Sequence, residues 1–336
     1  MSTPSLTSEA AGRAPARPAA PARRRRSPLS NDWQRRAEVA LLVLPALALF
    51  LLFVVLPMVQ AAYYSIYNWN GLEARDQIIG LGNYEQVLGD PEFRRAVWHN
   101  LVIVVLSIVV QLPLGLGIAL LLNREIRGRG LLRTVVFVPY VLAEVVAGVI
   151  WLLMLQPNGF VDETLRLVGL DGLRQLWLGD TDVVLFTLLV VLTWKYVGFA
   201  IILFLAGLQG VPQDLHEAAA LDGASWWQTQ RSITIPLLGP TIRIWVFLSM
   251  IGSLQLFDMV WIMTGGGPAG ASSTMATYLV SQGFERFRFG YGSAVAVCLF
   301  AISFLLAITY QQLVLRRDNA DSSSRAGAGR SRRRGR

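Results

Sequence analysis

Six long apolar stretches dominate this sequence and limit its fold more than any other feature. Each is long enough for a helix to cross the hydrocarbon core of a bilayer, which takes about 20 residues. They cover residues 40–62, 101–122, 132–155, 183–208, 241–263 and 293–315. Backbone polar groups inside lipid must be satisfied within the segment, so such stretches fold as helices. The sequence therefore predicts an all-α polytopic membrane protein with six transmembrane helices.

The composition supports this interpretation. Of the 336 residues, 54% are hydrophobic and 15% are charged, whereas soluble domains carry about 25% charged residues. The single cysteine, Cys298, excludes an intrachain disulfide framework, and two histidines, His99 and His216, are too few for a histidine-based metal site. We expect no metal site and no cofactor in this chain.

Arginines are distributed unevenly among the segments that connect the apolar stretches. With the N-terminus in the cytoplasm, 22 arginines fall in cytoplasmic segments and 7 in outer loops. Arginine and lysine favour the cytoplasmic side of a membrane, so both termini and the segment 210–240 are predicted to be cytoplasmic. This bias also explains the net charge of +8, and no nucleic-acid partner is expected. Residues 1–36 and 316–336 are predicted to be disordered basic tails around a transmembrane domain over 37–315.

The segment 210–240 is the longest polar interval inside the apolar region, between the fourth and fifth stretches. Asp214 is positioned to cap a helix, and Glu217 follows three residues later, as in a capping box. Gly223 is expected to end this helix, because glycine is unfavourable inside helices.

A second helix is expected directly after this turn. Ser225 can cap it, and Pro236 should end it near Ile235, because proline lacks an amide donor and disfavours helix in the preceding residue. The segment 210–240 is therefore predicted to form a helix–turn–helix.

This segment resembles the EAA loop of permease subunits in binding-protein-dependent ABC importers. The resemblance rests on Glu217, Ala218, Ala219, Asp222, Gly223, Ala224, Ile233, Pro236 and Pro240. One position departs from the pattern, since Gln230 stands where the family usually has an aromatic residue. In that family the loop docks on the ATPase subunit, so the resemblance implies that Glu217–Pro240 couples this chain to a separate ATPase. The alternative is an amphipathic helix lying on the membrane surface.

Several further motifs resemble the sugar-permease subgroup of the same family. They occupy residues 67–71, 80–84, 90–93, 99–100, 264–274 and 289–294, and with the loop they extend the resemblance over roughly 40–315. The alternative for the polar motifs of the first outer loop is turn chemistry. The glycine-rich stretch 264–272 is expected to form a flexible external loop.

The resemblance implies a function and a set of partners. The chain would form half of the translocation pathway of an ATP-driven importer of a sugar, an oligosaccharide or glycoside, in a bacterial cell membrane. Its partners would be a second homologous permease, two ATP-binding subunits and an extracellular sugar-binding protein. Lys195 is the single lysine and follows no glycine, so the chain has no phosphate-binding P-loop. It is therefore predicted to be a transport subunit and not an enzyme, with ATP hydrolysed by a partner.

Polar residues within the apolar stretches are costly in lipid and mark candidate functional positions. Lys195 lies near the middle of the fourth stretch, and Asp258 lies in the fifth. They could pair with each other, line an aqueous cavity or reach water at a helix end, and for Lys195 a cavity or a pairing is favoured. If they form a relay, the chain would instead be a stand-alone ion-coupled transporter.

Their neighbours complete the predicted substrate pathway. Tyr196 and Phe199 share a helix face at i, i+3, where their rings could stack on a sugar, and Ser249 and Ser253 share a face at i, i+4. Gln255 adds a polar group to the same stretch. Small residues and serines at this spacing also serve helix–helix packing, which is the alternative.

Overall fold

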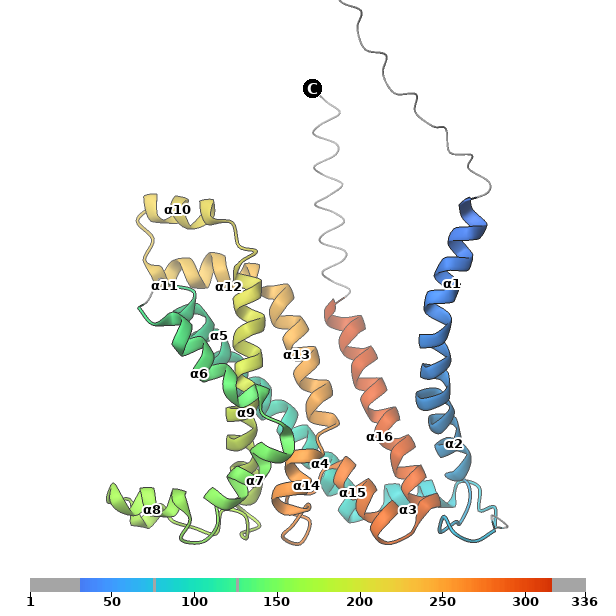
Figure 1. The fold of residues 1–336 in the computed structure, drawn as a ribbon. Coiled ribbons are helices and arrows are strands. Elements are labelled where there is room, and N and C mark those ends of the chain that lie inside the picture. Colours follow the sequence, from blue (N-terminus) through green and yellow to red (C-terminus); the bar gives the residue numbers. More distant parts are fainter. Residues whose placement is uncertain (1–30, 75–76, 125–126, 316–336) are drawn as a thin grey trace, which may run out of the picture. The chain divides into compact units, whose positions relative to one another are not determined.

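Helices make up most of the chain that the computed structural model describes, which comprises residues 31–74, 77–124 and 127–315 (Figure 1). Within these ranges β-type pairing is limited to one isolated bridge between Tyr67 and Ile78, with no β-strand. The prediction of an all-α fold is confirmed. The predicted tails lie outside the described residues, apart from residues 31–36.

The chain divides into two units, residues 1–57 and 58–336. The described part of the first unit contains helix α1 (Asn31–Phe50) and a π-helical turn (Leu51–Val55), and α2 (Leu56–Tyr64) crosses the boundary without a break. Because α1 begins at Asn31, the last residues of the predicted N-terminal tail are helical. The helix from Arg36 to Tyr64 is long and apolar enough to cross a membrane.

The second span, within the second unit, begins ten residues earlier than the apolar stretch suggested. It consists of α4 (Pro91–Leu106), a π-helical turn (Ser107–Gln111) and α5 (Leu112–Leu122), which together run for 32 residues. The Asp90 side chain caps α4 by accepting a hydrogen bond from the Glu92 amide at 2.7 Å, and proline is favoured in the first helical turn. The short helix α3 (Gly82–Gly89) precedes it.

The third apolar stretch is not one straight helix. α6 (Arg129–Val141) and α7 (Glu144–Met154) meet at an angle of 96°. The chain then forms α8 (Phe160–Leu167) and a 3₁₀ turn (Asp171–Leu173).

Helix α9 (Val184–Leu208) is the central span of the second unit and is buried among α4–α5, α6 and α13. Glycines allow its neighbours to come close. A Cβ atom on Gly115 of α5 would lie 2.7 Å from the Ala200 Cβ, and one on Gly198 would lie 2.5 Å from the Val136 carbonyl oxygen. Small residues at such crossings let backbones of membrane helices pack closely.

The fifth apolar stretch is also broken. α13 (Gly239–Leu254) ends before α14 (Asp258–Thr264), so the predicted continuous span 241–263 is wrong. Two side chains satisfy backbone carbonyls at this break. Asn100 Nδ2 donates to the carbonyl oxygen of Ser253 at 2.7 Å, and Thr274 Oγ1 donates to the carbonyl oxygen of Leu256 at 2.8 Å. Irregular backbone at membrane depth is tolerated where protein groups replace the lost helical bonds.

The remaining helices follow in order. They are α15 (Met275–Val280), a π-helical turn (Ser281–Glu285), α16 (Phe289–Tyr310) and a final π-helical turn (Gln311–Leu315). The described chain thus has four helices long and apolar enough to span a membrane, or six if each of two bent helix pairs counts as one span.

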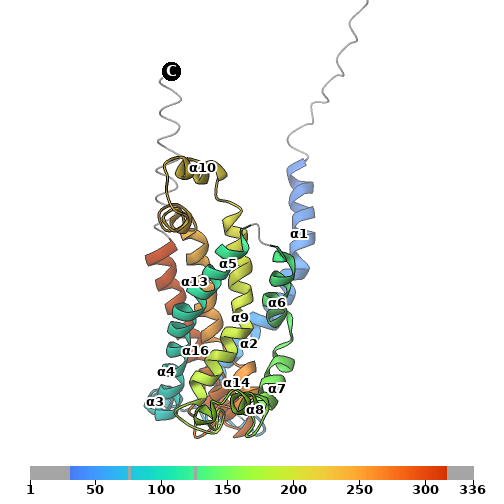
Figure 2. The same ribbon diagram turned by 90° about the vertical axis from the view of Figure 1, so that its left-hand side faces the viewer.

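The two ends of the second unit carry different elements. Helices α10 (Gln213–Leu221) and α11 (Trp226–Thr229) lie at one end, and α3, α8 and α14 lie at the opposite end (Figures 1 and 2). The stretch 264–272, expected to be flexible, is folded by hydrogen bonds. Thr264 Oγ1 and Ser272 Oγ lie 2.8 Å apart, and Ser272 Oγ also donates to the Gly267 carbonyl at 2.6 Å.

Candidate functional site

The segment 210–240, called the 210–240 loop below, begins with helix α10. Pro212, in an extended conformation, occupies the N-cap position, so Asp214 lies inside the first turn. The predicted capping box between Asp214 and Glu217 is therefore wrong. Glu217 instead accepts a hydrogen bond from Gln213 Nε2 at 3.1 Å. The carboxylate remains exposed on the outer surface of the helix.

The turn after α10 depends on Gly223. Its φ is +74°, and its amide donates to the Ala220 carbonyl at 3.1 Å while the Ala224 amide donates to the Ala219 carbonyl at 2.9 Å. These two bonds form a Schellman motif, in which glycine is favoured because the left-handed conformation is costly for other residues. No atom lies within 4 Å of a Cβ built at Gly223. The requirement for glycine here is conformational and not steric, and the predicted turn is confirmed.

The second helix continues further than predicted. Ser225 and Gln228 form a capping box at the start of α11, as the serine suggested. A π-helical turn (Gln230–Thr234) and α12 (Ile235–Leu237) then carry the helix past Pro236. In the π turn the Ile235 amide donates five residues back, to Gln230, and Pro236 occupies the first turn of α12, where its missing amide is tolerated. The predicted stop at Ile235 is wrong, and the bend of 65° lies at Leu238.

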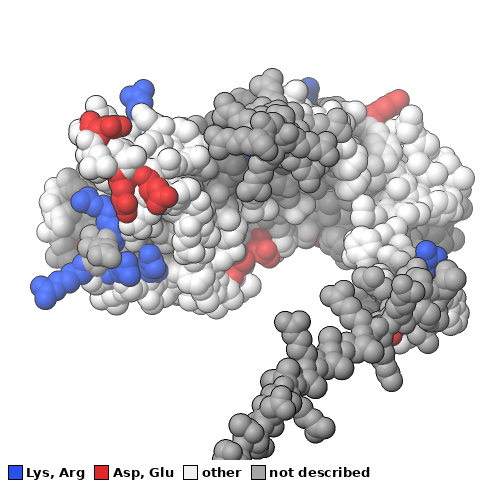
Figure 3. Space-filling model, turned by 90° about the horizontal axis from the view of Figure 1, so that it is seen from above, with Lys and Arg blue, Asp and Glu red and all other residues white. Residues whose placement is uncertain are grey.

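The 210–240 loop presents acidic, small and apolar groups on its surface. Of its predicted coupling residues, Glu217, Ala218, Asp222, Gly223 and Pro236 are exposed, Ala224 and Ile233 are half-buried, and Ala219 is buried. Leu221 and Trp227 are 90% and 64% exposed. Figure 3 shows acidic and basic side chains gathered on the side of this end where α10 and α11 lie.

A cavity of about 210 Å³ lies between α4, α6, α9 and α13. Four of the predicted pathway residues line it, namely Tyr196, Phe199, Ser249 and Ser253. Three do not: Lys195 is buried next to the wall, with Nζ 5.9 and 6.0 Å from the ring centroids of Tyr140 and Tyr196, and Gln255 and Asp258 are exposed at the break between α13 and α14. The structure therefore brings together the pair Tyr196 and Phe199 and the pair Ser249 and Ser253, which helical periodicity had each placed on one helix face.

Other lining residues were missed in the sequence. Ser107 and Gln111 come from the π-helical turn between α4 and α5, and Tyr140 comes from α6. The spacing of Ser107 and Gln111, i and i+4 within an apolar stretch, is a signal that could have identified them. π-helical turns inside α-helices occur frequently at functional sites. The Tyr140 and Phe199 rings are stacked, with centroids 5.3 Å apart and planes at 25°.

In the structure Lys195 neither pairs with Asp258 nor lines the cavity. Its side chain is 1% exposed, and Nζ donates to the carbonyls of Pro139 (3.1 Å), Tyr140 (3.0 Å) and Leu142. Its ion pair is with Glu144, Nζ to Oε1 3.8 Å. These acceptors lie on both sides of the bend between α6 and α7. Lys195 thus satisfies the carbonyls that the bend leaves without helical amides.

Glu144 connects this bend to the cavity. Its Oε1 accepts a hydrogen bond from the Tyr196 hydroxyl at 3.0 Å, and Tyr196 lines the cavity wall. The position of one aromatic wall residue therefore depends on the first turn of α7.

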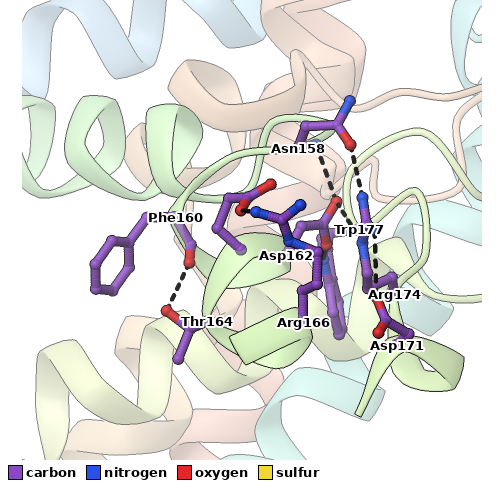
Figure 4. A network of polar contacts seen from close by, with 9 residues as sticks. Asn158, Phe160, Asp162, Thr164, Arg166, Asp171, Arg174 and Trp177 are labelled. Carbon is purple, nitrogen blue, oxygen red and sulfur yellow. Dashed lines mark hydrogen bonds and ion pairs between the residues drawn. The ribbon is translucent and has the colours of Figure 1, made fainter. Parts of the chain in front are cut away.

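A polar network, drawn in Figure 4, fixes the segment between α7 and α9. This segment lies at the end opposite the 210–240 loop (Figure 1). Asp162, which is 4% exposed, accepts hydrogen bonds from Trp177 Nε1 at 2.8 Å and from the Asn158 amide at 3.0 Å. Arg174 approaches Asp162 to 4.0 Å and donates to Asn158 Oδ1 at 2.6 Å. The network gives this segment a defined structure that the sequence did not indicate.

Comparison with known proteins identifies relatives over most of the chain. Residues 111–319 match the family model described as "Binding-protein-dependent transport system inner membrane component". The trehalose/maltose transport system permease protein MalF of Thermococcus litoralis is 33% identical over 80% of this chain and 91% of its own length. The diacetylchitobiose uptake system permease protein NgcF of Streptomyces coelicolor is 32% identical over 90% of this chain and 88% of its own length.

Solved structures agree with this result at the level of the fold. A bacterial ABC transporter involved in the import of the acidic polysaccharide alginate contains a chain that superposes with a TM-score of 0.75 at 23% identity. The match covers 85% of the present chain and 97% of that chain.

Proposed function

The chain belongs to the family of inner membrane components of binding-protein-dependent transport systems, and we propose that it forms half of the translocation pathway of an ATP-driven sugar importer. The named relatives transport trehalose and maltose in one case and diacetylchitobiose in the other. The alignments extend over about nine tenths of each relative, which supports a common role for the whole chain.

The observation that carries this proposal is a nearly continuous helical path from the 210–240 loop to the cavity. From α11 the backbone is helical through α12, bends at Leu238 and continues as α13. Ser249 and Ser253 of α13 line the cavity. A helix transmits displacement along its axis because its hydrogen bonds resist local deformation. A partner that moves the loop would therefore move one wall of the cavity.

The partner on this loop would be a separate ATP-binding subunit. Glu217 and Asp222 supply charge, the exposed Leu221 and Trp227 supply apolar area, and the small residues Ala218 and Gly223 permit close approach of another protein surface. ATP binding in a pair of such subunits would displace the loop and shift the cavity between inward-facing and outward-facing states. A second, homologous permease would complete the pathway, and an extracellular sugar-binding protein would deliver the sugar at the opposite end.

No observation in the described residues supports a stand-alone ion-coupled transporter. That function required Lys195 and Asp258 to act as a relay. The Lys195 ammonium is surrounded by backbone carbonyls and Glu144, and Asp258 is exposed at the start of α14.

The proposal is tested by purifying the tagged chain from detergent and identifying co-purified proteins by mass spectrometry. We expect a P-loop ATPase to accompany the wild-type chain and to be lost from Glu217→Lys. Glu85→Lys is the matched control, because Glu85 is also exposed near the middle of a short helix, α3, but this helix lies at the opposite end. Recovery of the chain without any ATPase, together with ATP-independent solute uptake in proteoliposomes, would refute the proposal.

A further inference from the structure

The cavity between α4, α6, α9 and α13 is lined by polar and aromatic groups and contains no charged side chain in its wall. We propose that it accepts uncharged saccharides and excludes those that carry a carboxylate or sulfonate. This inference rests on the proposed function and adds the charge class of the substrate to it.

Neutral hydrogen-bonding groups line the cavity from α6 and α13. Tyr140, Ser249 and Ser253 each contribute a hydroxyl group to the residues that line the cavity. The Gln111 amide donates to Ser107 Oγ at a long distance of 3.4 Å. Hydroxyls both donate and accept, as sugar hydroxyls do. The wall can therefore exchange hydrogen bonds with a neutral sugar without supplying a net charge.

Aromatic surfaces complete this arrangement. The Tyr140 and Phe199 rings, stacked with centroids 5.3 Å apart, and the Tyr196 ring, from the same helix as Phe199, belong to residues that line the cavity. A saccharide ring has apolar C–H faces and a polar periphery. Apolar rings beside neutral donors and acceptors match that pattern, since polar groups that lose water must find partners.

The charged residues nearest this wall do not favour an anion. The Lys195 ammonium is taken up by three carbonyls and Glu144. The Glu144 carboxylate accepts a hydrogen bond from the hydroxyl of Tyr196, a residue of the wall. An anion entering from water would lose its hydration without gaining a counter-charge, and a buried unpaired charge is strongly unfavourable.

The fold does not decide this property by itself. A chain with a TM-score of 0.75 to this one belongs to a transporter of an acidic polysaccharide. The selectivity for charge must therefore come from the residues of the cavity and not from the arrangement of the helices.

The inference can be tested at the cavity, whatever the identity of the sugar. Cys298, the single cysteine, is replaced by serine in the full complex, and Ser249→Cys is introduced. Membrane vesicles are treated with neutral methyl methanethiosulfonate or with anionic sulfonatoethyl methanethiosulfonate. Thr164→Cys is the matched control, because Thr164 is exposed on α8, away from the cavity. We expect the ratio of neutral to anionic reaction rates to be at least about tenfold higher at position 249 than at position 164.

Saccharide protection and uptake form the second part of the test. Maltose, trehalose and diacetylchitobiose serve as neutral probes, and digalacturonate serves as the anionic probe. We expect a transported neutral probe to slow modification at position 249 and digalacturonate to leave it unchanged. Equal rate ratios at both positions, or uptake of digalacturonate at the rate of a neutral probe, would overturn the inference while leaving the importer function intact. Rejection of the anionic reagent without uptake of any saccharide would support the charge exclusion and count against the sugar importer.

Discussion

Replacing Lys195 by methionine tests whether this residue stabilises the bend between α6 and α7. The substitution keeps a long apolar stem but removes Nζ, which leaves the carbonyls of Pro139, Tyr140 and Leu142 without this donor and Glu144 without its ion pair. A hydrogen bond to a charged group contributes about 1.5–3 kcal/mol, and breaking a buried ion pair costs about 3–5 kcal/mol.

Two features of the site reduce the simple sum of these values. The Glu144 side chain is 32% exposed, so water will partly replace the ion pair. Hydrogen bonds between membrane helices average only about 0.6 kcal/mol, because the groups find other partners. The carbonyls at the bend are less able to find other partners, because helix α6 ends at the bend. We therefore expect Lys195→Met to lower the free energy of unfolding by about 3 kcal/mol.

The measurement is reversible unfolding in mixed detergent micelles, with Asp258→Asn as the control. Asp258 is exposed, so its neutralisation should change stability by less than about 0.5 kcal/mol. The double variant Lys195→Met/Glu144→Gln separates the two contributions. If the carbonyls dominate, it remains as unstable as Lys195→Met, whereas full recovery would assign the effect to the ion pair. Wild-type stability of Lys195→Met would refute the reasoning.

Three further outcomes are expected. Gly223→Val should abolish uptake while the complex still assembles, because a β-branched residue is strained at φ +74°; normal uptake would contradict a coupling role for the turn. Gly115→Leu should destabilise the chain by about 2 kcal/mol or more in the same unfolding assay, because a Cβ atom at position 115 would lie 2.7 Å from the Ala200 side chain. The control Gly117→Leu should be tolerated, because a Cβ atom at position 117 would meet open space. Burial raises the pKa of Asp90, but hydrogen bonds from the Tyr278 hydroxyl and the Glu92 amide outweigh it and hold the pKa below its usual value. The ionised form of Asp90 therefore stabilises the fold above about pH 4. The difference in melting temperature between the wild-type chain and Asp90→Asn should narrow as the pH falls below that value.

Local sequence patterns were sufficient to predict an all-helical chain and the turn within the polar loop. The apolar stretches are long enough to require helices, and the turn at Gly223 and the cap at Ser225 depend on residues within a few positions. The pairs Tyr196–Phe199 and Ser249–Ser253 were placed on shared faces by periodicity, and the cavity contains both. The function of these residues remains a prediction.

The breaks in the third and fifth spans could not be predicted in this way. Leu142 and Ala143, at the first break, are ordinary apolar residues. The residue that satisfies the carbonyls there, Lys195, is more than fifty positions away in the sequence. The second break depends in the same way on Asn100. Such contacts between distant segments leave no local pattern, and the same cause explains why Tyr140 was missed as a lining residue.

These breaks also explain where the cavity forms. Tyr140 lies next to the bend of the third span, and Ser253 and Leu256 lie at the break of the fifth, whereas Tyr196 and Phe199 belong to the unbroken helix α9. Binding sites of membrane transporters are commonly built where helices are discontinuous, because the backbone there is free of helical pairing. In this chain the side chains of Lys195 and Asn100 satisfy those backbone groups and leave the neutral groups of the wall available. A displacement of α13 would then move Ser253 relative to a fixed α9, so the cavity would change shape without any change in α9 itself.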